Sequence, residues 1–262
     1  MENLQSDHLD TQNLYRDMQK RTGGEIYIGV VGPVRTGKST FIKRFMDLMV
    51  LPFMEDEHAR ERTIDELPQS AAGKTIMTTE PKFIPQEAVE LKLAGEVTIR
   101  VRLVDCVGFM VEGAAGHLEN GAERLVKTPW YDHEIPFTQA AELGTRKVIT
   151  DHSTIGVVVT TDGSFSDLPQ ETYLDAENQA ISELKKLHKP FLVLVNSSHP
   201  SSRTAREAAE RIEKQHSVAA MPVNCAQLSE EDIRQIMEQI LYEFPVSRVE
   251  FYMPKWVEML PP

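Results

Sequence analysis

Cysteine is scarce in this chain: 262 residues include only two, Cys106 and Cys225. Each stands beside an apolar, strand-like run, which favours buried thiols in a reducing compartment over a disulfide. The first 24 residues contain no signal-peptide core, and no later apolar run approaches the ~18 residues of a membrane-spanning helix. We therefore expect a soluble, cytoplasmic protein without a transmembrane segment and with both thiols reduced.

Positive charge is also in short supply, because 28 Lys and Arg face 40 Asp and Glu, for a formal net charge of -12. No long basic run is present, which disfavours nonspecific binding to nucleic acid or to an anionic lipid surface. The chain also lacks internal repeats and low-complexity tracts. With 41% hydrophobic residues it has enough apolar material for one large core, and we expect one main domain.

What the chain does contain is the stretch GPVRTGKST at residues 32–40, which matches the phosphate-binding pattern GxxxxGK[S/T]. A strand-like run over residues 25–31 precedes it, and an amphipathic, helix-like run over 41–49 follows it. In this order the loop amides face phosphates at a helix N-terminus, the lysine reaches the β- and γ-phosphates, and the serine ligates Mg²⁺. The alternative, an ordinary glycine turn with an exposed lysine, is disfavoured by this context. The candidate nucleotide-binding residues are Gly32, Arg35, Thr36, Gly37, Lys38, Ser39 and Thr40.

Two further segments extend the candidate site. The apolar run Ile99–Val104 ends in Asp105-Cys106-Val107-Gly108, a DxxG pattern in which the carboxylate supports Mg²⁺ and the glycine amide meets the γ-phosphate. Thr78 and Thr79 lie between the two motifs, where a loop hydroxyl senses metal and γ-phosphate, although the pattern leaves open which of them faces the ion. The alternatives are an ordinary turn after a strand and ordinary loop threonines. The candidate catalytic residues are Lys38, Thr78, Thr79 and Asp105, and the candidate metal ligands are Ser39, Thr79 and Asp105.

The residues around these motifs predict slow hydrolysis and a preference for ATP. Phe109 stands where a small GTPase has a glutamine that orients water, so unassisted hydrolysis should be slow. Arg35, Arg146 and Lys147 are sources of transition-state charge, although solvated surface charge is the favoured interpretation for each.

Guanine-specific relatives carry NKxD after the fifth strand, whereas residues 196–199 are Asn-Ser-Ser-His. Losing the aspartate removes the main discrimination for guanine, which favours ATP or relaxed specificity. Asn196 and His199 are the candidate residues for base contacts.

Strand-like and helix-like runs alternate along the chain. Strands are expected over 89–93, 97–104, 155–161, 191–195 and 218–223, and helices over 55–67, 138–150, 171–187, 205–215 and 229–243. This order predicts an α/β P-loop NTPase fold with three α/β/α layers and a mostly parallel sheet. We expect an N-terminal helical extension at 1–22, the P-loop domain at 23–246 with an insertion at about 109–136, and the start of a following region at 247–262.

Beyond the generic motifs, longer runs resemble the N-terminal ATPase region of the stage IV sporulation protein A family, the spore-coat morphogenetic ATPases of endospore-forming bacteria. The likeness spans roughly residues 23–262. The similar runs are 29–32 with 34–43, 65–83, 103–108, 144–149 and 152–163. The resemblance implies a fold of the translation-factor-related GTPase type turned to ATP.

The resemblance also implies that Mg²⁺-dependent ATP hydrolysis drives self-assembly into a static polymer. That polymer is the basement layer of the spore coat, on the mother-cell side of the outer forespore membrane. The implied partners are further copies of the chain, a small amphipathic membrane-associated recruitment protein and other coat proteins. Two other functions stay open: a scaffold module stabilised by bound nucleotide, with incidental hydrolysis, and a GTPase-like switch.

Overall fold

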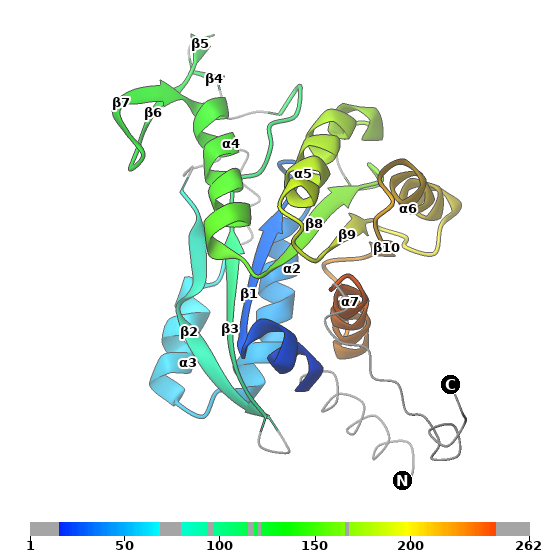
Figure 1. The fold of residues 1–262 in the computed structure, drawn as a ribbon. Coiled ribbons are helices and arrows are strands. Elements are labelled where there is room, and N and C mark those ends of the chain that lie inside the picture. Colours follow the sequence, from blue (N-terminus) through cyan, green and yellow to red (C-terminus); the bar gives the residue numbers. More distant parts are fainter. Residues whose placement is uncertain are drawn as a thin grey trace, which may run out of the picture.

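A six-stranded sheet forms the centre of the computed structural model, which describes residues 16–68, 80–93, 97–114, 118–119, 122–165 and 168–244. The strand order is β10-β9-β8-β1-β3-β2 (Figure 1). All neighbours are parallel except β2, which pairs antiparallel with β3. The sheet strands are β1 Glu25–Val31, β2 Lys82–Leu93, β3 Val97–Asp105, β8 Ile155–Thr161, β9 Phe191–Asn196 and β10 Ala220–Val223.

Helices cover both faces of the sheet (Figure 1). One core cluster joins the sheet to α2 and α7, and the other joins it to α5 and α6. Alternate residues of a strand enter opposite clusters, as with Val157 and Val158, because successive side chains of a strand point to opposite faces. The helices are α2 Lys38–Phe45, α3 Glu57–Glu66, α4 Phe137–Lys147, α5 Leu174–Lys186, α6 Arg203–His216 and α7 Glu230–Tyr242. These layers confirm the predicted α/β fold with a mostly parallel sheet, that of a P-loop NTPase.

Several elements differ from the sequence prediction in extent. Strand β2 begins at Lys82, seven positions earlier than expected, and pairs antiparallel with β3, with an irregularity between Ile84 and Val89. The helix after the phosphate loop begins at Lys38 and changes to a π-helical turn over Met46–Val50. A second π-helical turn, Val148–His152, continues α4.

The expected long loop at 109–136 contains two small antiparallel hairpins in its described part. They are β4 Leu118–Glu119 with β5 Ala122–Glu123, and β6 Leu125–Thr128 with β7 Tyr131–Pro136. The expectations for residues 1–15 and 247–262 lie outside the described residues, whereas residues 16–22 are helical.

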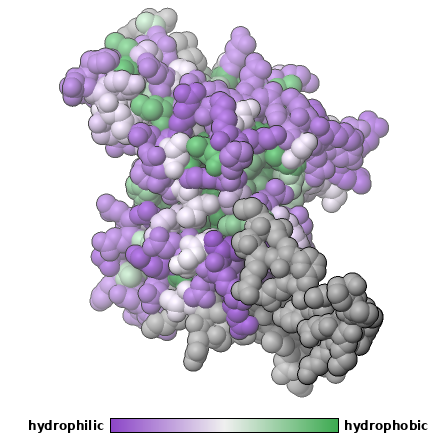
Figure 2. Space-filling model, in the orientation of Figure 1, coloured by the Kyte–Doolittle hydropathy of each residue, from purple (hydrophilic) through white to green (hydrophobic). Residues whose placement is uncertain are grey.

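The surface seen from the side of α4, α5 and α6 is mostly hydrophilic, with apolar patches that are small and separated (Figure 2). This agrees with a chain in which 26% of residues are charged. Within the described ranges no helix is both long enough and apolar enough to cross a bilayer.

Candidate nucleotide-binding site

The phosphate loop follows β1 and leads directly into α2. Its backbone turns through positive φ at Arg35, with φ 62°, and at Gly37, with φ 98°. Glycine is required at the second position for a steric reason as well, because a Cβ there would collide with the Asn196 side-chain amide. Two positive-φ residues, one of them a glycine packed against the Asn196 side chain, therefore shape the turn that leads into α2.

Hydrogen bonds hold this loop to the neighbouring strands. The Thr36 hydroxyl lies 2.6 Å from the carbonyl oxygen of Val159 in β8 and 3.0 Å from that of Pro33. Asn196 Nδ2 donates to the Thr36 carbonyl at 2.9 Å. The Thr36 side chain is buried and faces the sheet, so only its backbone is left for a phosphate. Thr40 lies in the first turn of α2 and is partly buried.

Lys38 is a buried cation within the loop. Its Nζ donates to the Pro33 carbonyl at 2.6 Å and lies against Gly108, at whose position a Cβ would come within 2.5 Å of it. Burial lowers the pKa of Lys38, while the neighbouring Cys106 and Asp105 act in the opposite direction. The structure therefore brings the lysine of the phosphate loop together with the DxxG segment.

A hydroxyl and a carboxylate meet beside this lysine. Ser39 Oγ donates to Asp105 Oδ2 at 2.8 Å, whereas Asp105 Oδ1 is buried with no hydrogen-bond partner. Burial raises the pKa of Asp105, and the bond from Ser39 and the charge of Lys38 oppose the rise. An unpartnered carboxylate oxygen beside a hydroxyl fits Mg²⁺, which is usually held by one or two carboxylates together with substrate phosphates. The part of the chain that the structure describes contains no cluster of three or more His, Cys, Asp or Glu side chains that could hold a metal ion.

The segment after Asp105 is fastened to the phosphate loop. Phe109 N donates to the Gly32 carbonyl at 3.0 Å, and Val34 N donates to the Phe109 carbonyl at 2.9 Å. The Phe109 ring is fully buried and packs in the same core cluster as Val34. Phe109 is therefore a core residue that aligns Gly108 with the loop, and its ring offers no group to orient water.

At the other end of the site, Asn196 links three segments. Besides its bond to Thr36, its Oδ1 accepts from Cys225 N at 3.0 Å. Both ends of this side-chain amide are thus used within the protein, which makes Asn196 a bracket between the phosphate loop and the loops after β9 and β10. His199 is exposed in the turn after β9.

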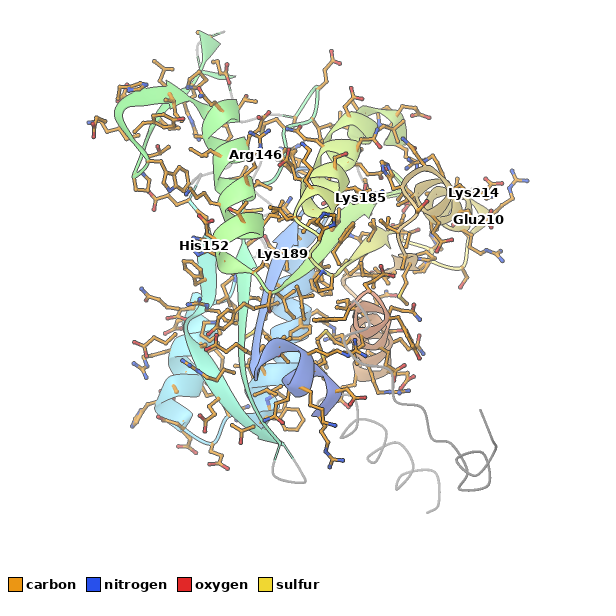
Figure 3. All side chains as sticks on the ribbon, in the orientation of Figure 1. Arg146, His152, Lys185, Lys189, Glu210 and Lys214 are labelled. Atoms are coloured by element: carbon orange, nitrogen blue, oxygen red, sulfur yellow. The ribbon has the colours of Figure 1, made fainter. Side chains whose placement is uncertain are left out.

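The remaining predicted residues lie apart from this cluster or outside the described part. Arg35 is exposed on the loop. Arg146 on α4 pairs with Glu183 on α5 at 3.6 Å, and Lys147 pairs with Asp151 at 3.0 Å (Figure 3). These partners support the surface-charge interpretation of both cations. Thr78 and Thr79 lie outside the described residues.

Sequence reasoning missed one polar residue that supports the surrounding structure, Lys189. Lys189 Nζ donates to the carbonyl oxygens of Ile149, Thr150 and Ser153 at 2.5, 2.9 and 2.6 Å, at the end of the π-helical turn that follows α4 (Figure 3). The position directly before Pro190 and a core strand gave no sign of this role. A lysine near helix carbonyls is recognisable only once the fold brings them together.

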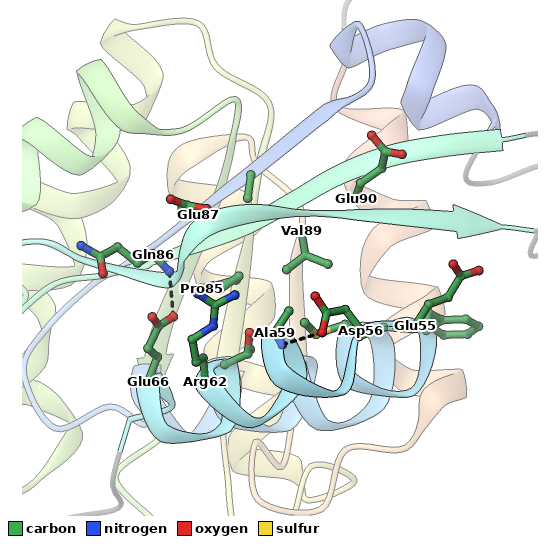
Figure 4. Close-up of a pocket in the computed structure, with 14 residues that line it drawn as sticks. Glu55, Asp56, Ala59, Arg62, Glu66, Pro85, Gln86, Glu87, Val89 and Glu90 are labelled. Atoms are coloured by element: carbon green, nitrogen blue, oxygen red, sulfur yellow. Dashed lines mark hydrogen bonds between the residues drawn. The ribbon is translucent and has the colours of Figure 1, made fainter.

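A cavity of about 470 Å³ lies elsewhere, between α3 and the edge strand β2 (Figure 4). None of its lining residues is a predicted site residue. Glu66 Oε2 accepts from Gln86 N at 2.8 Å there, which satisfies a backbone donor on the strand's open side. We attribute this contact to protection of a sheet edge rather than to the nucleotide site.

The comparisons with a family model and with curated proteins agree on one family. Residues 9–245 match the family described as "Stage IV sporulation protein A, ATPase domain". The chain is 51% identical over 248 residues to stage IV sporulation protein A of Clostridioides difficile, covering 95% of this chain and 50% of that protein. It is 46% identical over 252 residues to the Bacillus anthracis protein of the same name, covering 96% of this chain and 51% of that protein. The chain thus spans about half the length of these curated relatives.

A solved structure titled as a complex of SsGBP with GDP aligns with a TM-score of 0.46 at 13% identity, covering 83% of this chain and 50% of that one. A likeness this distant carries no argument about function. The family match extends over most of the chain and includes the phosphate loop, Asp105 and Asn196. This chain belongs to the stage IV sporulation protein A family and contains its ATPase domain.

Proposed function

We propose that this chain binds ATP with Mg²⁺ and hydrolyses it to ADP and phosphate, and that hydrolysis drives self-assembly of a spore-coat basement layer. The observation that supports this best is the pair formed by Ser39 and Asp105. One carboxylate oxygen accepts from the serine hydroxyl at 2.8 Å, and the other is buried without a partner. A divalent cation bound to a triphosphate would give the unpartnered carboxylate oxygen a ligand.

In the proposed complex different residues bind different parts of the nucleotide or the metal ion. Amides of the phosphate loop and the Lys38 ammonium would bind the β- and γ-phosphates, and Ser39 and Asp105 would hold Mg²⁺, which neutralises phosphate charge. The Gly108 amide is proposed to meet the γ-phosphate. Thr78 and Thr79 are proposed to sense it, with Thr79 the third metal ligand, from a segment outside the described residues.

ATP is the proposed nucleotide because the turn after β9 lacks the guanine-binding aspartate. His199 occupies that position, and Ser197 occupies the position of the lysine that lies along the base. A site without the bidentate carboxylate leaves guanine's ring N–H and amino group unpaired. We therefore propose a clear preference for ATP, with Asn196 setting the position of the loops and His199 at the rim.

Family membership supports the proposed assembly role. We propose that copies of the whole protein polymerise on the mother-cell side of the outer forespore membrane. A small amphipathic membrane-associated protein is proposed to recruit them, and other coat proteins to bind the polymer. Because this chain covers half of its relatives' length, the polymer contacts need not all lie within it.

One observation favours a second candidate, in which ATP is a bound brace and turnover is incidental. Phe109 is fully buried and supplies no water-orienting group at the position after the DxxG motif. Phosphate release measured against protein concentration separates the two functions. Turnover that rises with assembly supports the ATPase-driven polymer, and turnover that stays flat supports the brace.

Titration of ATP and GTP into the chain by calorimetry, with and without Mg²⁺, tests the main proposal. We expect tight, Mg²⁺-dependent ATP binding in the wild type and none detectable in Lys38→Ala. Lys43→Ala is the matched control, because Lys43 is an exposed lysine further along α2. Absence of heat with ATP and Mg²⁺ in the folded wild type, or an equal loss in both variants, would contradict the proposal.

A further inference from the structure

Three loops meet beyond the carboxyl ends of neighbouring parallel strands. They follow β8, β9 and β10 and comprise residues 162–165, 197–199 and 224–226. Ligands of open α/β sheets bind at this edge, and the phosphate loop follows β1 there as well. The loop at 162–165 contributes no residue to the site described above. Hydrogen bonds nevertheless connect it to the turn after β9, where guanine-specific relatives carry NKxD.

Ser164 makes the connection. Its Oγ accepts from Ser198 N at 2.8 Å, and its carbonyl oxygen lies 3.4 Å from Ser198 Oγ, which donates to it. Its Oγ also lies 3.4 Å from Ser197 Oγ. One serine 33 and 34 positions away in the sequence thus holds two consecutive residues of the turn.

The turn is closed further by its own hydroxyl. Ser197 Oγ accepts from His199 N at 3.0 Å, and Ser197 is only 1% exposed. Asn224 Nδ2 donates to the Ser198 carbonyl at 3.4 Å, which adds the loop after β10. The Ser197 and Ser164 hydroxyls lie within hydrogen-bond distance of each other, and either of them can be the donor. Ser164 is exposed, and in the arrangement where Ser197 donates, the Ser164 hydroxyl hydrogen is available to a ligand.

These contacts form a hydroxyl clasp, defined by Ser164, Ser197 and Ser198. The clasp is continuous with the phosphate loop, because Asn196 directly precedes it and donates to Thr36. A displacement of the clasp would therefore change the position of the base end of the site relative to the phosphate end. This gives the clasp a means of fixing where the base lies once the phosphates are bound.

We propose that Ser164 is a specificity-determining residue that positions the turn after β9 and thereby selects adenine over guanine. The proposal rests on the proposed ATP-binding function. The locked turn presents hydroxyl groups where guanine needs a carboxylate, so guanine's N1–H and amino group have no bidentate acceptor there. Adenine brings ring-nitrogen acceptors, to which the Ser164 hydroxyl can donate in the arrangement where it accepts from Ser197.

The test compares Ser164→Ala, Ser164→Thr and Thr172→Ala. Thr172 is the matched control, because its hydroxyl donates to the Pro169 carbonyl at 2.7 Å in the 3-10 turn Gln170–Tyr173 and makes no contact with the clasp. Competition of ATP and GTP against a fluorescent ATP analogue, with Mg²⁺ present, gives both affinities. We expect Ser164→Ala to lower the ATP-over-GTP ratio about three- to tenfold, the worth of one or two hydrogen bonds. Ser164→Thr, which retains the hydroxyl, and Thr172→Ala should keep the wild-type ratio.

A merely structural serine would change the two affinities by the same factor, so an unchanged ratio in Ser164→Ala overturns the proposal. A fall of the ratio in Thr172→Ala as large as in Ser164→Ala also overturns it. Thermal melting of each variant establishes that the comparison is made on folded protein. Failure of the wild type to bind either nucleotide would instead refute the proposed function on which the specificity rests.

Discussion

Lys38 and Asp105 are two opposite charges that burial disfavours in the same small site. Burial lowers the pKa of the lysine from its ordinary 10.5 and raises that of the aspartate from its ordinary 3.8. Each charge partly offsets the cost of the other. A bound Mg²⁺ and triphosphate would stabilise both ionised forms at once, because the cation faces the carboxylate and the anion faces the ammonium.

The affinity for MgATP should therefore depend on pH through both groups. The complex needs ionised Asp105, so affinity falls as pH falls through a pKa above 3.8. It also needs protonated Lys38, so affinity falls as pH rises through a pKa below 10.5. Calorimetric titration across this range should give a bell-shaped profile. Asp105→Asn should bind MgATP at least tenfold more weakly at neutral pH, the effect expected of a lost charged ligand, and should lose the Asp105 contribution to the acid limb.

The control for that profile is Asp151→Asn, which removes an exposed carboxylate paired with Lys147. It should leave the affinity and the profile unchanged. An acid limb that stays identical in Asp105→Asn would show that another group, such as the ATP phosphates, causes it.

The kind of side chain at these positions could be predicted from the sequence, but not its direction. GxxxxGK[S/T] and DxxG identified Lys38, Ser39 and Asp105, which the structure brings together. The same pattern could not tell that the Thr36 hydroxyl faces β8. It also could not tell that both ends of the Asn196 amide are used within the protein. Those orientations depend on contacts between segments 29 to 160 positions apart in the sequence.

Between elements, an ion pair with a buried carboxylate and a partly exposed arginine joins α5 and α6, and the carboxylate also bonds β8. Glu177 on α5 is 1% exposed; its Oε2 accepts from the Thr160 hydroxyl at 2.7 Å, and its Oε1 lies 2.8 Å from Arg211 Nη2 on α6. The two atoms are close but are not aligned for a hydrogen bond, so the contact is electrostatic. Thr160 directly follows Val159, whose carbonyl holds the phosphate loop.

Removal of the arginine should leave a buried, uncompensated carboxylate. We expect Arg211→Met to lower the free energy of unfolding by roughly 1–3 kcal/mol, less than for a fully buried pair, because the Arg211 side chain is 31% exposed and Glu177 keeps its bond from Thr160. Glu177→Gln combined with Arg211→Met should recover much of that loss, because the charge is gone. Urea denaturation measures both variants.

The exposed pair Lys214–Glu210 on the same helix supplies the control (Figure 3). Lys214→Met should change the free energy of unfolding by less than ~1 kcal/mol, since surface pairs contribute little. If Arg211→Met is equally mild, the carboxylate of Glu177 is not a buried charge in solution.

The order of elements could be predicted because it is a local property. Apolar runs such as Phe191–Val195 are buried on both sides, and alternation with amphipathic helices implied the parallel sheet. The early start of β2 at Lys82 and the hairpins at 118–136 could not be predicted. Their residues are mixed in polarity, and their strands exist through pairing rather than through apolar content.

Across the whole molecule, the two cysteines lie in different core clusters, so each thiol can serve as a probe of one cluster. Cys106 belongs to the cluster that includes α5 and α6, and Cys225 to the cluster that includes α2 and α7. Both are free thiols, as expected from the sequence, and both are buried. Burial raises the pKa of Cys106 to about 11 and that of Cys225 to about 12. Neither thiol can react quickly in the native state, because the reactive thiolate is both rare and covered.

Thiol labelling should therefore follow opening of the fold. At pH 8 we expect no rapid labelling of the native chain by a chromogenic disulfide, and two thiols per chain after denaturation. If the thiols are labelled only after the fold opens and releases the nucleotide, MgATP at 100 times its Kd should slow the labelling about 100-fold. This corresponds to a stabilisation of the closed fold by roughly 2.7 kcal/mol. Lys38→Ala should show no such protection. Rapid labelling of one thiol in the folded wild type would mean that one layer opens alone, and mass spectrometry of the labelled peptide would identify whether that layer is the one beside Asp105.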